Sequence, residues 1–374
     1  MKVAVTGVGG LLGWHASVRL HAYNCAASFE GKDIPFELVR LDRESFSNAA
    51  SIAKKLAAVD AILHFAGVNR GESDEVEKAN PSIAKTLVQG CKDADVNPYI
   101  LYANSTHSGR HTPYGRSKRV AGEILEDFAE NYCNLVLPHI FGENAKPYYN
   151  NVTATLIDQI HSNALPVINP DGEVSLLYAG DAVHMATNLA LEKRVGTIQP
   201  NGQKISVPSL YEKLKYFHSL YRENIFPNLA EKIDLNLFNC YRSAAFPTNQ
   251  PIKIKLNKDD RGVLFEAAKG GGPDGQSFMS TTAPGITRGD HFHCEKVERF
   301  LVVRGKAIIR LRRVLTDELY EFQVNGDEPV AIDIPPLYTH SIENIGNDDL
   351  YTLFWAHEMF DPNNPDTYAH SVLQ

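Results

Sequence analysis

The chain has 374 residues, of which 43% are hydrophobic and 22% charged, and its formal net charge is −8. This length exceeds one ordinary hydrophobic core, so we expect two domains. The negative charge argues against nucleic acid as a partner, because binding a phosphate backbone needs a concentrated basic face. Strand-sized apolar runs and an N-terminus without a signal-peptide pattern predict a cytoplasmic protein with no membrane partner. Five scattered cysteines predict reduced, buried thiols.

In the first 140 residues, short apolar runs alternate with amphipathic stretches. The runs predict strands at 3–6, 36–42, 61–66, 99–104 and 135–138, and the stretches predict helices near 11–24, 47–58, 76–92 and 114–131. Strands buried on both faces and alternating with helices are typical of an α/β, Rossmann-like, doubly wound parallel sheet.

Three glycines follow the first predicted strand. Gly7, Gly10 and Gly13 permit a tight turn, close approach of a pyrophosphate, and packing of the next helix on the strand. Asp42 ends the second predicted strand, where a carboxylate commonly holds the ribose hydroxyls of NADH. Arg43 follows it and could instead hold the 2′-phosphate of NADPH. These two residues leave the form of the cofactor open.

The ends of the third and fourth predicted strands carry the next candidates. The third strand runs into Ala66 and Gly67, which we expect beside the cofactor, and Ser105 ends the fourth. Tyr114 and Lys118 are four residues apart on a predicted helix, so they share a face. A neighbouring ammonium lowers the pKa of a phenol and makes it a usable proton donor. Ser105 can then hydrogen-bond the carbonyl that accepts the hydride.

The same Tyr-x-x-x-Lys spacing occurs a second time, at Tyr211 and Lys215. No strand-end serine precedes that pair, and its surroundings predict an exposed helix surface. The context of Tyr114, rather than its spacing, therefore makes it the candidate.

These motifs follow one another in a characteristic order: TGxxGxxG, DxxxHxAG, a strand-end serine, YxxxK, then Pro138–Gly142 and Tyr178–Asp181. The ordered set resembles the extended short-chain dehydrogenase/reductase family over residues 1–245, which is the first predicted domain. That family often acts on nucleotide-linked sugars.

The resemblance implies roles for particular residues. Ser105, Tyr114 and Lys118 would be catalytic, with Tyr114 as the proton donor and Lys118 also holding the nicotinamide ribose. The sugar nucleotide would lie over Lys146–Asn151, which makes Asn151 a substrate-binding candidate.

The composition changes near Pro247–Pro251. Beyond it, short strands are predicted at 297–304, 307–313, 319–323, 331–334 and 350–356. Many short strands separated by turns predict an all-β barrel or jelly roll in a second domain at 252–374.

Four residues of this second domain form a candidate metal site. His291 and His293 lie two apart on a predicted strand and therefore point to the same side. Glu298 on the next strand and His340 on a partner strand complete the set. Three imidazoles and a carboxylate suit one divalent transition metal, Zn²⁺ first, with Fe²⁺, Ni²⁺ and Mn²⁺ as alternatives. Four protein ligands leave no obvious open position, which favours a purely structural metal. The alternative is a catalytic metal that acts as a Lewis acid.

The spacing of these ligands resembles the two-motif signature of the cupin family, with Leu337 standing where the second motif usually has glycine. Asp259–Glu266 resembles the D-x-R-G-x-F-x-E stretch of cupin sugar-nucleotide 3,5-epimerases. That resemblance implies that Arg261 helps to hold a diphosphate. The alternative is an ordinary strand-opening turn with an exposed arginine.

The fusion of these two modules resembles a family of bifunctional capsular-polysaccharide enzymes. This implies C3 epimerisation of a UDP-linked 4-keto-6-deoxy-N-acetyl amino sugar in the cupin, then C4 reduction with NADPH. Candidates for the C3 base are His340, Lys296 and Tyr338, although Lys296 could equally be a solvated charge. By analogy with cupins that pair through exposed strands, the protein would be a homodimer.

Two other functions stay open at this point. The first is a reductase whose cupin serves only for stability and dimerisation. The second is a non-catalytic sensor that binds NADP(H). The intact set of Ser105, Tyr114 and Lys118 argues against a sensor, which has no need of it.

Overall fold

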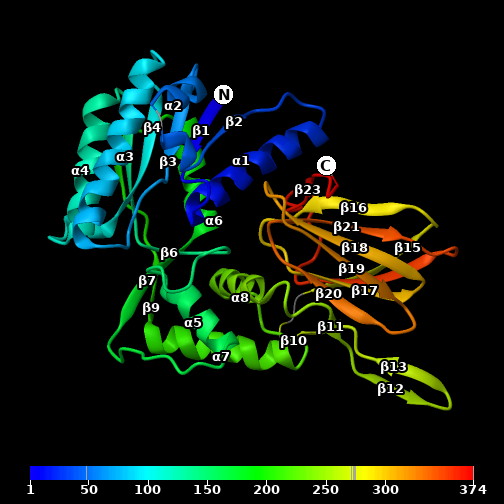
Figure 1. Cartoon of the computed structure of the whole chain (residues 1–374). Helices are drawn as coiled ribbons and strands as arrows, with labels where there is room; N and C mark the ends of the chain where they lie inside the picture. Colours follow the sequence, from blue (N-terminus) through cyan, green and yellow to red (C-terminus); the bar gives the residue numbers. More distant parts are fainter. Residues whose placement is uncertain (48, 271, 273–274, 374) are drawn as a thin grey trace. The chain divides into compact units, whose positions relative to one another are not determined.

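The computed structural model describes residues 1–47, 49–270, 272 and 275–373. The chain forms two compact units, shown in Figure 1. The first comprises Met1–Leu156 and Val167–Leu210, and the second comprises Ile157–Pro166 and Tyr211–Gln374.

A six-stranded parallel sheet forms the centre of the first unit, in the order β2-β1-β3-β4-β5-β8. Its strands are β1 (Lys2–Thr6), β2 (Glu37–Leu41), β3 (Ala61–His64), β4 (Tyr99–Ser105), β5 (Tyr132–Leu137) and β8 (Gly196–Ile198). Strands β2 and β3 flank β1 on opposite sides, so the direction of winding reverses there. In such sheets, ligands bind at the carboxyl ends of the strands beside this reversal.

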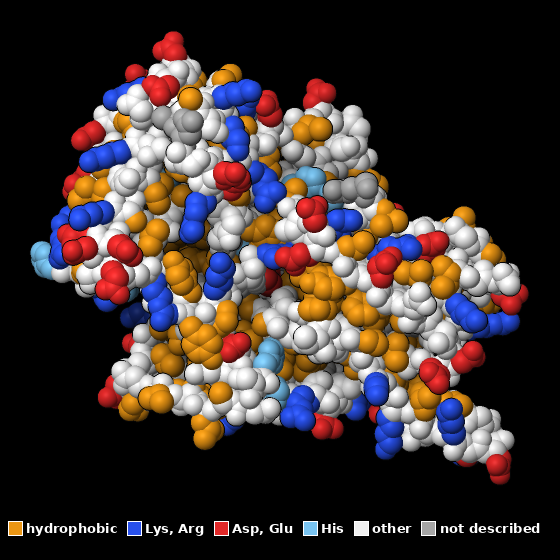
Figure 2. Space-filling view, viewed as in Figure 1, with side chains coloured by type: hydrophobic (Ala, Val, Ile, Leu, Met, Phe, Trp, Pro, Cys, Tyr) orange, Lys and Arg blue, Asp and Glu red, His pale blue; other side chains and the backbone are white. Residues whose placement is uncertain are grey.

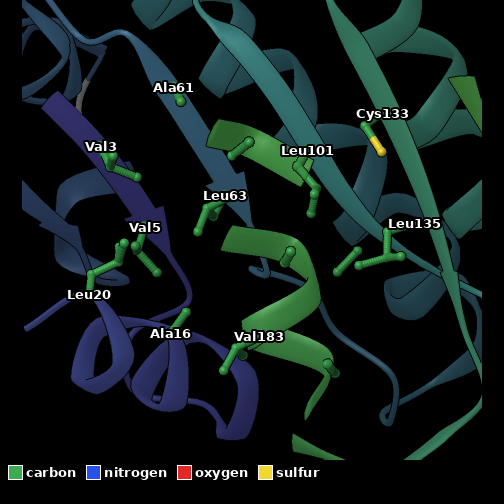
Figure 3. Packing of buried hydrophobic residues seen from close by; sticks show 14 of the residues in the cluster. Val3, Val5, Ala16, Leu20, Ala61, Leu63, Leu101, Cys133, Leu135 and Val183 are labelled. Atoms are coloured by element: carbon green, nitrogen blue, oxygen red, sulfur yellow. The ribbon is translucent and has the colours of Figure 1, made fainter. Parts of the chain in front are cut away.

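Helices cover both faces of the sheet. One face packs against α1 (Leu11–Phe29) and α6 (Ala179–Leu191), and Figure 3 shows Val5 and Leu63 of the sheet beside Ala16 and Leu20 of α1 and Val183 of α6. The other face packs against α2 (Ala49–Leu56), α3 (Ser73–Asp93) and α4 (Pro113–Phe128). Because β4 is buried on both faces, its first five residues, 99–103, are all apolar. The predicted doubly wound parallel sheet is confirmed.

The remaining elements of the first unit are short. A three-stranded sheet is formed by β6 (His139–Phe141), β7 (Glu173–Tyr178) and β9 (Gln203–Ser206). Two 3₁₀ turns, η1 (Glu44–Phe46) and η2 (Thr106–Gly109), follow β2 and β4. The division between the units falls within α5 (Val152–His161) and α7 (Val207–Arg222).

Two five-stranded antiparallel sheets form the barrel of the second unit, in the orders β11-β20-β17-β22-β15 and β19-β18-β21-β16-β23. The strands of the first are β11 (Ile252–Lys253), β15 (Gln276–Thr282), β17 (Glu298–Arg304), β20 (Val330–Ile334) and β22 (Leu350–Ala356). Those of the second are β16 (Thr287–Phe292), β18 (Lys306–Arg313), β19 (Leu319–Asn325), β21 (Tyr338–Asn344) and β23 (Tyr368–Ala369). Alternate side chains of both sheets point inward to form one apolar core. The prediction of an all-β C-terminal region is confirmed.

Other elements accompany the barrel. They are α8 (Lys232–Ala245), the parallel pair β10 (Ile225–Phe226) and β14 (Lys269–Gly270), and the hairpin of β12 (Leu256–Asp259) and β13 (Gly262–Phe265). In Figure 1 this hairpin projects from the barrel.

Residues 211–245, which the sequence analysis places with the reductase domain, belong to the compact unit that contains the barrel. The hydroxyl of Tyr221 donates to the buried Asp333 of β20 at 2.6 Å. The guanidinium of Arg242 donates to the carbonyls of Lys296 and Ile334. These buried polar bonds tie α7 and α8 to barrel strands.

The surface and the cysteines show three further features. None of the described helices is long and apolar enough to cross a membrane. On the face drawn in Figure 2, acidic and basic side chains are interspersed. All five cysteines are free and buried, as predicted.

Candidate active site and metal centre

The glycine turn between β1 and α1 is built as the sequence predicts. Gly7 has φ +70°, and a Cβ there would lie 2.8 Å from the backbone nitrogen of Ala66. A Cβ on Gly13 would lie 2.2 Å from the carbonyl oxygen of Gly7. Only glycine therefore permits the close approach of the turn to the residues after β3, and of α1 to the turn. Gly10 caps α1 and leaves the N–H groups of its first turn available to an anion.

The end of β3 is fixed to β1 by side chains. The Thr6 hydroxyl accepts from the backbone N–H of Ala66 at 2.9 Å and bonds Nδ1 of His64 at 2.8 Å. Burial lowers the pKa of His64 to about 3, so its imidazole is neutral. A Cβ on Gly67 would lie 2.9 Å from Oδ1 of Asn80, which leaves room for glycine alone. Ala66 and Gly67 thus lie beside the glycine turn, where the sequence analysis places them.

The candidates for cofactor discrimination follow β2. The Asp42 carboxylate accepts from the backbone N–H of Ser45 at 2.8 Å and from its hydroxyl at 2.6 Å. These bonds lower the pKa of Asp42, so it is ionised. Arg43 is exposed next to it. Both side chains lie after the carboxyl end of β2. The use of NADPH, with NADH as the alternative, stays a prediction.

The catalytic candidates lie at the carboxyl end of β4 and in the first two turns of α4. Ser105 ends β4, and Thr112 caps α4 by accepting from the N–H of Gly115 at 3.1 Å. Tyr114 and Lys118 follow one turn apart. Lys118 is buried; its Nζ donates to the carbonyl of Ala103 at 2.6 Å and lies 4.1 Å from the centre of the Tyr102 ring.

The electrostatics of this pair differ from the sequence-based expectation. Burial lowers the pKa of Lys118 to about 7, so the amine loses much of its charge near neutrality. Burial raises the pKa of Tyr114, and the hydrogen bond with Ser105 opposes that rise only in part. The predicted lowering of the Tyr114 pKa by an adjacent ammonium is therefore wrong in direction. A phenol that holds its proton at neutral pH is suited to donating it.

A polar residue missed by the sequence analysis links this helix to the β3 loop. Asn80 of α3 is buried and exchanges two hydrogen bonds with the backbone of Val68, at 2.8 and 2.9 Å. Its amide also donates to the Ser117 hydroxyl at 2.8 Å, which donates to the Tyr114 carbonyl at 2.8 Å. The isolated Asn80 in an amphipathic helix was the only available signal.

Two histidines were also missed. The His107 ring lies 6.3 Å from the Tyr114 ring. Burial lowers the pKa of His139, and the charge of His107 adds to this lowering. The buried Nε2 of His139 makes no hydrogen bond among the described residues. His139 belongs to the Pro138–Gly142 motif, which indicated the family but no role for this side chain.

The Asn151 side chain forms hydrogen bonds within the first unit. Its Oδ1 accepts from the backbone N–H of Ala154 at 3.0 Å, which caps α5, and its Nδ2 donates to the carbonyl of Ile140 at 3.0 Å. The side chain orders the loop before α5, and contact with a substrate stays a prediction.

The second Tyr-x-x-x-Lys pair lies on α7 as a surface feature. Lys215 is exposed, lies 5.2 Å from the centre of the Tyr211 ring and bonds Glu212 at 3.3 Å. The predicted exposed helix surface is confirmed.

The four predicted metal ligands come together within the barrel. His291 of β16 pairs in register with His340 of β21, while His293 follows β16 and Glu298 begins β17. Nε2 of His293 lies 2.9 Å from Oε2 of Glu298, and Nε2 of His340 lies 3.6 Å from the same oxygen. One ligand atom from each of the four residues lies within 4.8 Å of the others.

The electrostatics of this group suit a cation. Burial would raise the pKa of Glu298, but the three histidines outweigh it and keep the carboxylate ionised. Burial lowers the pKa of His291 to about 4 and that of His340 well below its ordinary value, so both imidazoles are neutral and able to ligate. The buried Nε2 of His340 makes no hydrogen bond among the described residues, at a cost of about 1–3 kcal/mol. Three imidazoles and one carboxylate fit Zn²⁺ or a related divalent ion.

The turn before His340 forms without glycine. Leu337 has φ +64° and is buried, and its N–H donates to the carbonyl of His293 at 2.7 Å. The left-handed conformation costs a non-glycine residue about 1–2 kcal/mol. Burial of the side chain and this hydrogen bond offset that strain.

The candidate C3 bases have distinct surroundings. Lys296 is only 7% exposed; its Nζ donates to the carbonyl of Pro365 at 2.8 Å and lies 3.8 Å from a carboxylate oxygen of Glu358. The interpretation of Lys296 as a solvated charge is therefore wrong. Burial raises the pKa of Tyr338 well above its ordinary value.

Arg261 lies at the turn of the β12–β13 hairpin. Its side chain is 90% exposed and bonds Asp259 at 2.5 Å. This geometry is that of the strand-opening turn with an exposed arginine. A role in holding a diphosphate stays a prediction.

The fold and the two residue groups define a class: a dinucleotide-binding domain of the extended short-chain dehydrogenase/reductase type followed by a cupin-type barrel. Residues 3–200 match the NAD dependent epimerase/dehydratase family, and residues 257–368 match the polysaccharide biosynthesis C-terminal domain. The chain belongs to the NAD dependent epimerase/dehydratase family.

Several similar proteins match this chain along its full length. A UDP-2-acetamido-2,6-beta-L-arabino-hexul-4-ose reductase of Pseudomonas aeruginosa is 32% identical over 382 residues, covering 100% of this chain and 99% of that protein. The capsular polysaccharide assembling protein CapF of Staphylococcus aureus is 33% identical, with a TM-score of 0.57 and 100% of both chains covered. CapF with the inhibitor 3-isopropenyl-tropolone is 31% identical, with a TM-score of 0.53 at the same coverage. The resemblance to capsular-polysaccharide enzymes is confirmed.

Proposed function

We propose that this protein is a bifunctional sugar-nucleotide enzyme of capsule or O-antigen biosynthesis, in the pathway to UDP-N-acetyl-L-fucosamine. The barrel epimerises a UDP-linked 4-keto-6-deoxy-N-acetylhexosamine at C3, and the first unit then reduces C4 with NADPH. The observation that carries the proposal is the group of Ser105, Tyr114 and Lys118 at the carboxyl end of the parallel sheet. Full-length similarity to a UDP-sugar 4-ketoreductase supports the choice of substrate.

The residues of the first unit supply positioning and a proton. The start of α1 binds the cofactor pyrophosphate, and Lys118 holds the nicotinamide ribose. NADPH, when bound, supplies the hydride. Ser105 hydrogen-bonds the C4 carbonyl, and Tyr114 donates a proton to its oxygen. The raised pKa of Tyr114 keeps that proton in place until the oxygen becomes basic.

The barrel carries out the C3 step. The C4 ketone acidifies the C3 proton, so a base can remove it and allow a proton to return from the opposite face. A divalent ion held by His291, His293, Glu298 and His340 would supply electrostatic stabilisation of enolate charge. His340 is committed to the ligand group, which leaves Lys296 and Tyr338 as the candidates for the base that removes the C3 proton.

Joining the two reactions has a chemical consequence. Reduction at C4 removes the carbonyl that makes the C3 proton acidic. The configuration set in the barrel is therefore trapped by the reaction of the first unit. This accounts for the presence of both domains in one chain.

The proposal extends to assembly and location. Edge strand β15 exposes Phe278 and Met279, which supports pairing of two copies through the barrel as a homodimer. Five free, buried thiols fit the reducing cytoplasm.

Isotope exchange tests both activities. The purified protein is incubated with a UDP-4-keto-6-deoxy-N-acetylhexosamine in D₂O, with and without NADPH, and C3 is followed by NMR. We expect deuterium at C3 without NADPH and a C4-reduced sugar with it. Absence of both reactions would contradict the assignment to sugar nucleotides.

A second function is favoured by one observation, the closed set of four protein ligands. Such a set is typical of structural zinc. The barrel would then serve only stability and dimerisation, and C4 reduction would proceed without exchange at C3.

A further inference from the structure

The C-terminal segment returns to the metal ligands after the last long strand of the barrel. β23 pairs with β16, so that His291 lies opposite Ala369 and Phe292 opposite Tyr368. Residues 357–367, just before β23, pass the loop that separates the ligands His293 and Glu298.

One side chain of this segment holds that loop. The Asp366 carboxylate accepts from three successive backbone N–H groups: Cys294 at 2.9 Å, Glu295 at 2.8 Å and Lys296 at 3.0 Å. Successive N–H groups that converge on one anion form a compact, oriented nest. The Lys296 side chain binds the same segment through the carbonyl of Pro365. The loop conformation between the two ligands therefore depends on Asp366.

The backbone of the same residue orients a ligand directly. The carbonyl oxygen of Asp366 lies 2.5 Å from Nδ1 of His293. Because a carbonyl can only accept, Nδ1 of His293 donates this hydrogen bond, and Nε2 is the nitrogen directed at the ligand group. That Nε2 faces Glu298 at 2.9 Å. A hydrogen bond on the far nitrogen is the usual means of setting the tautomer and ring orientation of a ligating histidine.

We infer that Asp366 is a positioning residue of the metal centre. Its carboxylate holds the 294–296 loop and its carbonyl holds the His293 ring, so it sets the affinity for the divalent ion without touching it. The inference rests on the proposed metal site and not on the sugar chemistry. Loss of metal affinity and loss of C3 exchange are therefore separately measurable.

The test is Asp366→Asn in the full chain. Asparagine keeps the size and the backbone carbonyl but replaces one carboxylate oxygen with an NH₂ group that faces N–H donors. The matched control is Asp361→Asn. Asp361 is exposed in the same segment, and among the described residues its carboxylate accepts only a local bond from the N–H of Asn363, at 2.9 Å. Chelator-stripped proteins are titrated with Zn²⁺ against a competing chelator, and with Co²⁺ followed by visible absorption.

We expect Asp366→Asn to weaken Zn²⁺ binding by about 10- to 100-fold and to change the Co²⁺ spectrum, as outer-shell substitutions do. Asp361→Asn should match the wild type within about twofold. A lower melting temperature of the stripped Asp366→Asn protein with unchanged Zn²⁺ affinity would overturn the inference, because it would show a purely structural role.

A second variant covers failure of the first to fold. Asp366→Glu keeps the charge but displaces the carboxylate by one methylene from the three N–H groups. Weaker Zn²⁺ binding with an unchanged melting temperature of the stripped protein supports the inference. Unchanged Zn²⁺ binding by this variant contradicts it.

Discussion

The two candidate sites differ in what holds their polar groups. In the first unit, Lys118 donates to the carbonyl of Ala103 and Asn80 connects α3 with α4, so protein atoms satisfy these two side chains. In the barrel, three imidazoles surround the carboxylate of Glu298, and the buried Nε2 of His340 makes no hydrogen bond among the described residues. The arrangement of Lys118 and Asn80 is complete before a ligand binds. The group in the barrel is completed by a cation, so the stability of the barrel should depend on metal far more than that of the parallel sheet depends on cofactor.

The largest expected effect is on chemistry in the preformed site. Tyr114→Phe removes the proposed proton donor and should lower kcat for C4 reduction by about 10²- to 10⁴-fold, measured as NADPH consumption. The melting temperature and metal content should stay unchanged. Tyr211→Phe, at the same spacing from a lysine on α7, is the control and should keep full activity. An equal loss of kcat in both variants would contradict the assignment of catalysis to Tyr114 rather than to Tyr211.

Metal removal tests the other half of the comparison. An ion present at 100 times its Kd stabilises the state that binds it by about 2.7 kcal/mol. Treatment with a chelator should therefore lower the melting temperature of the barrel by about 5–10 °C. Binding of NADPH, followed by its fluorescence, should not change. A barrel that melts at the same temperature with and without chelator would show that the four side chains are stable together without a bound ion.

The buried lysine of the preformed site gives a pH signature. The Lys118 pKa is about 7 in the folded protein, whereas an unfolded lysine keeps its proton up to about pH 10.4. Between these values the unfolded chain binds the extra proton, so the free energy of unfolding rises with pH, by at most about 1.4 kcal/mol per pH unit. Lys118→Met should remove this slope, and its stability relative to the wild type should be highest below pH 7.

Urea unfolding of the first unit between pH 6 and 10 measures this effect. Lys215→Met is the control, because Lys215 is exposed on α7 and its removal should leave the pH dependence as in the wild type. A Lys118→Met protein with the wild-type slope would show that the buried amine keeps its proton throughout this range.

Local patterns predicted much of both sites. The apolar run of β4 indicated a strand buried on both faces, and its end located Ser105. The spacing of His291, His293 and Glu298 was sufficient to predict the metal site. The two histidines lie two residues apart on one strand and so point to the same side, and Glu298 begins the next strand. Each of these inferences concerns residues that are near in sequence or that recur with the period of a single strand or helix.

Long-range contacts and burial were not predictable in this way. Asp366 lies 73 positions from His293, and nothing in either segment indicates the pairing. The direction of the Tyr114 pKa shift depends on desolvation, which the spacing to Lys118 does not contain. The amphipathic pattern of 211–245 shows that these helices bury a face. It does not show that the face packs in the unit of the barrel.

The smallest expected effect concerns the turn that delivers His340 to the metal group. At most positions alanine is more stable than glycine, because glycine loses more backbone entropy on folding. Leu337 has φ +64°, where glycine adopts the conformation without strain and alanine does not. Both Leu337→Ala and Leu337→Gly lose the buried leucine side chain, but we expect the glycine variant to be more stable than the alanine variant by about 1 kcal/mol. Urea unfolding of the zinc-loaded proteins measures the difference. The reverse order would show that the metal centre is built without a left-handed residue before His340.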